Sequence, residues 1–233
     1  MIPLYDDRPT RSFPYVTIAL IIANFVVFGW WQRSMGLPHS MDLAALIPAD
    51  VMQRVPNADW HVLTSMFMHG TWLHLIGNMW FLWIFGTNIE DECGHFRFTI
   101  FYILCGAIAA GAHILVNPAS TIPLVGASGA VSGILGAYLL KHPHARIKTL
   151  LPVYIIWAVD IPAFVFLLIW VGLHIFAQST LPIGDKGGIA YLAHIAGFTA
   201  GLILINLFRR KREPRLATEG SWKRTKSDER TYG

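Results

Sequence analysis

The sequence predicts an all-α polytopic membrane protein with six transmembrane helices. Two observations lead to this fold class. Only 14% of the 233 residues are charged and 54% are apolar, whereas soluble domains carry about 25% charged residues. About 20 apolar residues span a bilayer, and the chain has five uncharged runs, at 12–32, 60–89, 98–140, 161–184 and 187–208. The lipid bilayer is therefore the expected surrounding of this chain.

The first two helices are predicted over 14–31 and 71–88. The first is longer than the apolar core of a cleaved signal peptide and ends in Trp30-Trp31 rather than in small residues. It is therefore expected to remain as a signal anchor. The connection 32–70 between these helices is the longest stretch that is predicted to be non-helical.

The third and fourth helices are predicted over 97–116 and 126–140. They share one long uncharged run, but Asn117-Pro118 and Pro123 interrupt it. Proline and asparagine are frequent at turns and break helices. The run is therefore divided into two spans.

The fifth and sixth helices are predicted over 161–177 and 188–208. Asp160 precedes Ile161-Pro162, and an aspartate at the N-cap with proline in the first turn is typical of a helix start. Asp160 is therefore expected to cap the fifth helix at the membrane surface.

Basic residues predict the orientation of these helices. With both termini cytoplasmic, 15 of the 18 lysines and arginines fall in the inner segments 1–13, 89–97, 141–160 and 209–233. This bias follows the positive-inside rule. We expect a cytoplasmic tail at 1–13, a six-helix domain at 14–208 and a basic, disordered cytoplasmic tail at 209–233. The positive charge thus reports topology, and no nucleic-acid partner is predicted.

Four polar side chains are predicted to lie at one depth in the membrane. At a rise of about 1.5 Å per residue from the inner charges, Ser128 lies roughly 20 Å and His194 roughly 22 Å above the inner face. His74 and Asn78 lie roughly 24 and 18 Å above it by the same count. Polar groups within a bilayer are costly and indicate function, so these four residues are the candidate site.

Small residues predict that two helices approach closely beside this site. They recur at four-residue or shorter spacing on the fourth and sixth helices, as Gly129, Gly133 and Gly136 and as Ala193, Gly197 and Gly201. Such spacing lets helix backbones pack closely. Close packing is what a serine hydroxyl needs to reach a histidine ring.

The fourth helix is too short to start at the outer surface. Its span over 126–140 is about 22 Å long, against a hydrocarbon core of about 30 Å. Ser128 would then lie in the first turn of a submerged helix, where unpaired N–H groups and the positive end of the helix dipole attract negative charge. His74 and Asn78 share one helix face and could add side-chain donors.

The chain resembles the rhomboid family of intramembrane serine proteases. Three motifs carry the resemblance, in the family's order and on its second, fourth and sixth helices. They are HxxxN at His74–Asn78, GxSG at Gly126–Gly129, and AHxxGxxxG at Ala193–Gly201. The match extends from about Trp60 to Phe208.

The resemblance implies a role for each candidate residue. Ser128 would be the nucleophile and His194 its general base and later acid, a dyad without aspartate. Asn78, His74 and the Ser128 backbone N–H would stabilise the oxyanion. The fifth helix would be a lateral gate with Trp170 on its gating face. Substrates would be transmembrane proteins cut near the outer surface, and no cofactor or metal is implied.

Three positions depart from well-known members of the family. His61 follows Trp60 where the family's loop motif has Trp-Arg. Ser132 replaces an aromatic residue that in some members packs under the catalytic histidine. Gly77 stands where some members have a phenylalanine that faces the gate. Each departure could change the rate, the gating or the choice of substrate.

Two other functions remain open from the sequence. One is an inactive rhomboid-like protein that binds membrane clients, although such proteins typically lack the serine or the histidine. The other is a bis-histidine haem protein, because several histidines lie in the outer half. A prokaryotic plasma membrane is the expected location, since no transit peptide precedes the first span. The site would open to the outer side, and no oligomeric state is predicted.

Overall fold

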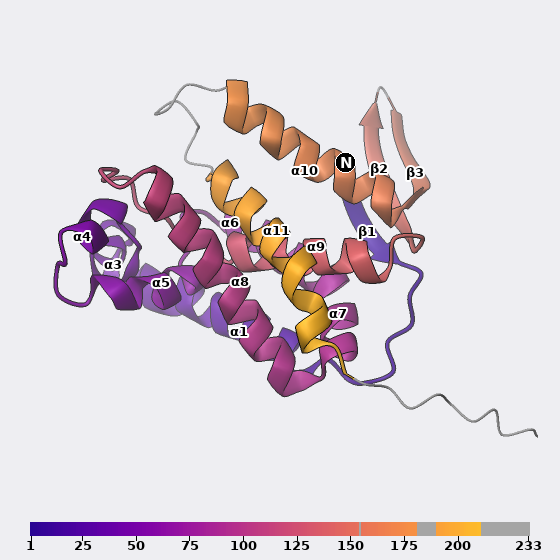
Figure 1. Ribbon diagram of the computed structural model, residues 1–233, viewed down its shortest axis with the longest axis horizontal. Coiled ribbons are helices and arrows are strands. Elements are labelled where there is room, and N and C mark those ends of the chain that lie inside the picture. The colour runs from indigo at the N-terminus through magenta and orange to yellow at the C-terminus, as the bar shows by residue number, and fades with distance from the viewer. Residues whose placement is uncertain (154, 181–189, 211–233) are drawn as a thin grey trace, which may run out of the picture.

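Helices occupy all six predicted positions in the computed structural model, which describes residues 1–153, 155–180 and 190–210. Four of them are long and apolar enough to cross a membrane, at Tyr15–Met35, His95–Val116 (α8), Ala163–Thr180 (α10) and Tyr191–Phe208 (α11). These helices are labelled in Figure 1. Six membrane crossings and cytoplasmic termini therefore remain predictions. The predicted disordered tail covers 209–233, and its residues from 211 onward lie outside the described part of the chain.

The remaining two helical positions are not among these four. The fourth helix, α9, runs over Ser128–Lys141 and has 14 residues. The second is built from α6 (Trp72–Phe81), a π-helical segment (Leu82–Gly86) and α7 (Thr87–Cys93). The first helix likewise combines α1 (Tyr15–Val26), π-helical turns (Val27–Gln32) and α2 (Arg33–Met35).

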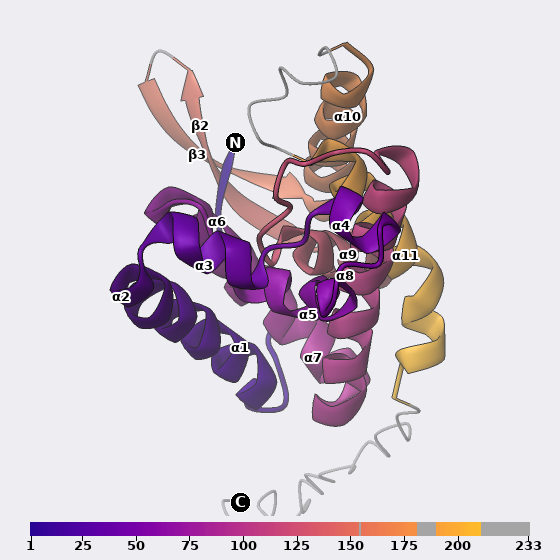
Figure 2. The same cartoon turned by 90° about the vertical axis from the view of Figure 1, so that its left-hand side faces the viewer.

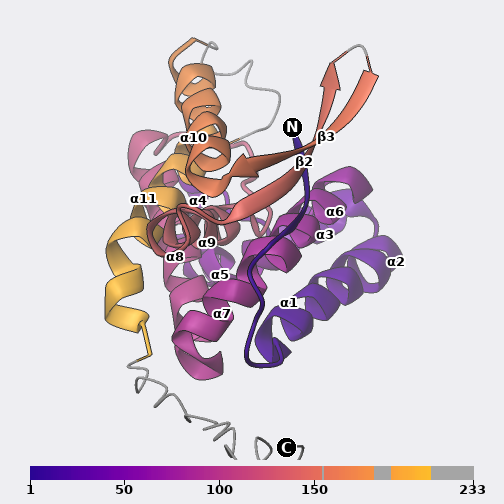
Figure 3. The ribbon, with the colours of Figure 1, turned by 90° about the vertical axis from the view of Figure 1, so that its right-hand side faces the viewer.

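The chain is mostly helical, as predicted, but it is not all-α, because it also forms a three-stranded antiparallel sheet. Its strands are β1 (Ile2–Asp6), β2 (Arg146–Val153) and β3 (Ile155–Pro162), in the order β1-β2-β3. In register, Ile2 lies opposite Leu150 and Asp6 opposite Ile147. The β2–β3 hairpin projects from the helices beside the start of α10 (Figures 2 and 3).

The prediction that Asp160 caps the fifth helix is also wrong. Asp160 lies on β3 opposite Lys148, and its carboxylate accepts a hydrogen bond from that lysine at 2.9 Å. This bond raises the pKa of Lys148 above its usual value. The helix begins only at Ala163, whose N–H donates to the Ala145 carbonyl at 2.8 Å, and Phe164 N–H donates to Pro143. Backbone carbonyls thus satisfy N–H groups that a cap would otherwise serve.

The connection 32–70 is largely helical, in contrast to the prediction. It contains α3 (Leu37–Ala44), α4 (Pro48–Met52), α5 (His61–Thr64) and two 3-10 turns, at Ala58–Trp60 and Ser65–Phe67. A β-bridge between Leu46 and Leu124 joins this region to the loop before α9. The connection therefore helps to fix the loop that leads to Ser128.

Helix α9 is the central element of the helical part. It contacts α6, α8, α10 and α11, and every residue from Ala130 to Tyr138 is buried. Its surroundings include large apolar side chains of the core such as Phe85, Phe101 and Phe166. A helix buried on all sides keeps its position although it is short.

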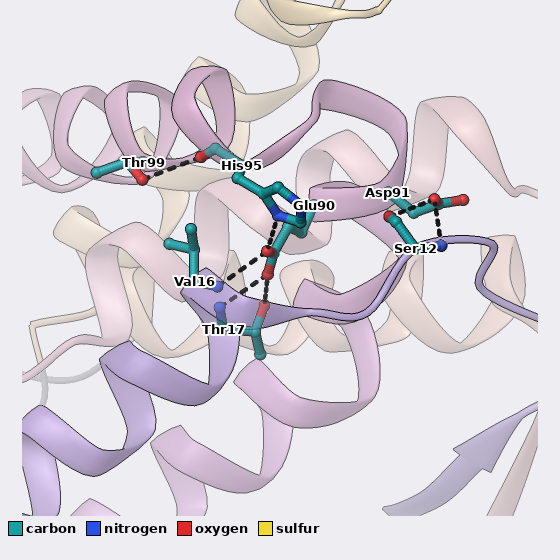
Figure 4. Close-up of polar contacts among 7 residues, drawn as sticks. All are labelled: Ser12, Val16, Thr17, Glu90, Asp91, His95 and Thr99. Carbon is teal, nitrogen blue, oxygen red and sulfur yellow. Dashed lines mark hydrogen bonds and ion pairs between the residues drawn. The ribbon is translucent and has the colours of Figure 1, made fainter.

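A buried carboxylate ties the start of α1 to α7 and α8 (Figure 4). Glu90 is fully buried and accepts hydrogen bonds from Val16 N–H (2.9 Å), Thr17 N–H (2.8 Å) and Thr17 Oγ (2.7 Å). His95 Nδ1 lies 2.6 Å from the same carboxylate. Charge-assisted hydrogen bonds of this kind satisfy the first N–H groups of α1 and fix its position.

Candidate functional site

Ser128 and His194 meet at the contact between α9 and α11. The Oγ atom of Ser128 lies 2.8 Å from Nε2 of His194. This distance allows the serine hydroxyl to donate to the ring nitrogen when that nitrogen is unprotonated, the arrangement in which a histidine can take the serine proton. The sequence count, which placed both residues at one depth, thus agrees with their contact.

Glycines at positions with no room for a Cβ atom allow α9 and α11 to pack closely together. A Cβ on Gly197 would overlap the carbonyl oxygen of Gly129, and one on Gly201 would overlap that of Gly133. A Cβ on Gly136 would overlap the carbonyl oxygen of Phe198. Backbones packed this closely are what the spacing of small residues predicted. The pairing of Ser128 with His194 depends on this contact.

The loop before Ser128 lies against the two predicted oxyanion residues. Gly126 has a φ of +117°, and a Cβ placed on it would lie 2.8 Å from His74 Nε2 and 3.4 Å from Asn78 Nδ2. The Gly126 N–H donates to the carbonyl of Ser65 at 2.9 Å. His74, Asn78 and the backbone that leads into α9 therefore lie close together. Polar N–H groups that converge in this way suit an oxyanion.

His69, for which the sequence left a place at the site or a structural hydrogen bond equally open, contacts both predicted oxyanion residues. Its Nε2 accepts a hydrogen bond from the Asn78 side-chain amide at 3.0 Å, and its ring lies 5.1 Å from that of His74. Gln32 holds the backbone of His69, donating to its carbonyl (3.1 Å) and accepting from its N–H (2.9 Å). The three residues that these hydrogen bonds connect, Gln32, His69 and Asn78, are all buried. The second amide hydrogen of Asn78 is left for another acceptor.

Trp170 on α10 lies beside the histidine of the pair. Its ring is 6.2 Å from that of His194, 6.2 Å from that of Phe198 and 4.0 Å from that of His174. The residue therefore faces α11. Contact of α10 with the second helix occurs elsewhere, where the Phe166 ring lies 6.4 Å from the Phe81 ring.

Two of the three unusual positions lie near this site. Ser132 is buried and its hydroxyl donates to the Ser128 carbonyl at 2.6 Å. Gly77 has open space where a Cβ would point. Neither position places an aromatic ring against the Ser128–His194 pair. The third position, His61, makes no contact with Ser128 or His194.

Within the described part of the chain, no group of three or more His, Cys, Asp and Glu side chains is arranged to hold a metal ion. Cys93 and Cys105 are buried as free thiols.

Comparison with known proteins gives several similar chains. "RHOMBOID-like protein 1" of Arabidopsis thaliana is 30% identical over 228 residues, covering 85% of this chain and 54% of that protein. "Rhomboid protein 1, mitochondrial" of Saccharomyces cerevisiae is 30% identical over 213 residues, covering 88% and 57%. "Rhomboid protease GluP" of Bacillus subtilis is 32% identical over 134 residues, covering 58% and 25%.

The chain matches only part of the length of each relative. The chain spans little more than half the length of the plant and yeast relatives. Relatives with mitochondrial or chloroplastic names, among them the yeast protein, do not support the predicted prokaryotic plasma membrane. Together with the apolar helices, they are consistent with an integral membrane protein.

The family model for the Rhomboid domain matches residues 56–211. This range begins just before α5 and includes α6, α9 and α11, on which the three sequence motifs lie. It therefore contains His74, Asn78, Ser128 and His194. With more than half of its residues matched by this model, the chain belongs to the rhomboid family.

Proposed function

We propose that the chain is an intramembrane serine endopeptidase that hydrolyses peptide bonds in or near transmembrane segments of membrane proteins. The observation that carries the proposal is the 2.8 Å distance between Ser128 Oγ and His194 Nε2. Membership of a family that includes proteases supports it. Both residues of the dyad are present, which favours an active enzyme over an inactive rhomboid-like protein that binds membrane clients.

The proposed reaction begins with attack by the serine. As Ser128 Oγ bonds to the carbonyl carbon of the substrate, its proton passes to His194 Nε2. The oxyanion that forms is stabilised by the Ser128 backbone N–H and by donors from Asn78 and His74. His194 then gives the proton to the leaving amine as the peptide bond breaks.

The second half of the reaction restores the serine. Water attacks the acyl group on Ser128 while His194 takes a proton from the water. The acyl–oxygen bond then breaks, the substrate leaves as a carboxylic acid, and His194 returns the proton to Ser128 Oγ. No cofactor takes part in this scheme.

Substrate access is proposed to occur from the lipid, with the site open to the outer side of the membrane. Helix α10 would act as the gate with Trp170 on it. Gly77 on the second helix leaves open space on the same side as His74, where some relatives carry a phenylalanine. Transmembrane helices would enter there and unwind to expose a peptide bond.

Covalent labelling tests the proposal. A fluorophosphonate is expected to label the purified, detergent-solubilised chain, and Ser128→Ala and His194→Ala are expected to abolish labelling and cleavage of a single-span substrate. Ser132→Ala is the matched control. It removes a neighbouring serine hydroxyl from the same helix, and the Ser128 carbonyl keeps its backbone hydrogen bond within α9. Labelling of Ser128→Ala equal to that of the wild type would show that the nucleophile is wrong.

A further inference from the structure

His174 is a second histidine that lies beside the proposed general base. Its ring centroid is 4.9 Å from that of His194, with the two planes at 60°. On its other sides it lies 4.0 Å from the Trp170 ring and 5.5 Å from the Tyr191 ring. Two further aromatic rings thus pack against His174 beside its contact with His194.

A backbone hydrogen bond fixes which nitrogen of His174 carries the hydrogen. Its Nδ1 lies 2.8 Å from the carbonyl oxygen of Trp170, one turn earlier in α10. A carbonyl oxygen only accepts hydrogen bonds, so Nδ1 is the donor. The neutral ring then has its lone pair on Nε2. His174 therefore offers an acceptor and not a donor at its remaining nitrogen.

His194 has the complementary requirement. Its Nε2 faces Ser128, and its Nδ1 is buried without a hydrogen-bond partner among the described residues. With Nε2 as the acceptor, Nδ1 carries the hydrogen of the neutral ring, and when Nε2 takes the serine proton the ring becomes a cation with an N–H at both nitrogens. A buried cation is costly unless it is hydrogen-bonded. In Ser-His-Asp triads a carboxylate accepts this N–H and orients the ring.

We propose that His174 is a positioning residue, whose Nε2 accepts the Nδ1–H of His194, directly or through one bridging water, while His194 carries the proton of Ser128. The inference rests on the proposed function. The proton itself does not pass to His174; it stays on His194 until the leaving amine takes it. At the observed ring separation either a direct bond or one water is within reach, and such bonds often shorten only in the reacting complex.

This arrangement explains why a small side chain can stand at position 132, where some members of the family have an aromatic residue. On the α9 side, the Cβ of Ser132 lies 3.4 Å from where a Cβ on Gly197 would stand, and Ser132 presents only a small side chain. On the α10 side, Trp170 and His174 lie against His194. Support for the histidine thus comes from the helix proposed as the gate.

Four variants of α10 test the inference. His174→Phe and His174→Leu remove the acceptor, whereas His174→Gln offers a side-chain oxygen that accepts a hydrogen bond. Leu173→Phe changes the adjacent position, which is 59% exposed. The measurement is the inactivation of each purified protein by a fluorophosphonate, separated into the maximal rate constant and the half-saturating concentration.

The expected result is a split between acceptor-containing and acceptor-free variants. The maximal rate constant should fall by about 10- to 100-fold in His174→Phe and His174→Leu, the contribution of one hydrogen bond to a charged group. His174→Gln should recover most of it, Leu173→Phe should match the wild type, and half-saturation should stay unchanged throughout.

Two results would overturn the inference. One is a rate constant in His174→Phe and His174→Leu equal to the wild type; the other is a His174→Gln variant as slow as both. If Ser128→Ala abolishes labelling in the same series, either result refutes only the role of His174. Labelling that persists in Ser128→Ala refutes the proposed function itself.

Discussion

The backbone of Gly201 on α11 lies directly against the carbonyl of Gly133 on α9, so a Cβ on Gly201 would overlap that oxygen and lie 2.5 Å from its carbon. Neither atom belongs to a flexible side chain, so the helices themselves would have to separate. Gly197 lies one turn before Gly201 on α11, and His194 lies three residues before Gly197. The distance between the two helices therefore sets the distance from Ser128 to His194.

Gly201→Ala is expected to lower the free energy of unfolding by about 1–3 kcal/mol, the usual cost of overpacking a tight core. Gly111→Ala in α8 is the matched control, because nothing lies within 4 Å of its Cβ position. That variant should stabilise the protein by about 0.4–1 kcal/mol. Thermal unfolding in detergent measures both, and equal melting temperatures for the two variants would contradict the close contact.

Asn78→Ala is expected to slow cleavage without abolishing it. Loss of one oxyanion donor lowers kcat by about 10²–10³-fold, while the dyad remains intact. The kcat and KM for a single-span substrate measure the effect, and KM should change little. A variant with wild-type kcat would remove Asn78 from the proposed oxyanion site.

His69→Phe is expected to act on the same step through Asn78. The substitution removes the acceptor that holds the Asn78 amide at 3.0 Å, so kcat should fall by about tenfold, which corresponds to the net contribution of one hydrogen bond. In the double variant with Asn78→Ala the two effects should not add, because the substitutions interrupt one interaction. The exposed His39 provides a control, and His39→Phe should leave kcat unchanged.

The sequence predicted the centre of the site more completely than its surroundings. Ser128 and His194 each lie in a helix that ends at basic residues, so counting from Lys141 and Arg209 gave their depths directly. The rise per residue of a helix is constant. The glycine spacing then predicted which helices touch. Both predictions use regularities within one helix.

Contacts between distant segments could not be obtained in this way. The pairing of β1 with β2 joins residues about 145 positions apart, and a short apolar run such as Leu150–Val153 is compatible with a strand or with a buried helix. The bonds from Gln32 to His69 and from His69 to Asn78 likewise depend on how three segments pack. His174 was recognised only through the orientation of its ring toward His194.

Gly126→Ala is expected to impair both folding and the proposed reaction. The φ of +117° is unfavourable for any residue with a Cβ, and that Cβ would lie 2.8 Å from His74. The strain should cost about 1–3 kcal/mol of stability, and movement of His74 and of the loop should reduce labelling of Ser128. Gly77→Ala is the control, since its Cβ position is open. Unchanged labelling and stability in Gly126→Ala would contradict the close approach of the loop to His74.

Glu90→Gln is expected to destabilise the protein while leaving the Ser128–His194 pair intact. The Glu90 carboxylate is fully buried and receives hydrogen bonds on both oxygens, from Val16, Thr17 and His95 (Figure 4).

An amide at position 90 replaces one of these oxygens with a donor that would face other donors. The loss should be about 3 kcal/mol, because breaking a buried charged interaction typically costs this much. Thr99→Ala removes a half-buried side chain one turn after His95, whose hydrogen bond to the His95 carbonyl is exposed, and should alter stability by less than about 0.5 kcal/mol.

Thermal unfolding in detergent measures the stability of both variants, and labelling below the transition reports the dyad. We expect Glu90→Gln to melt at a lower temperature than Thr99→Ala and to label at the wild-type rate when folded. If the two variants melted together, the buried carboxylate would not be what fixes α1. If Glu90→Gln instead lost labelling while still folded, the position of α1 would be coupled to the site through Gln32 and His69.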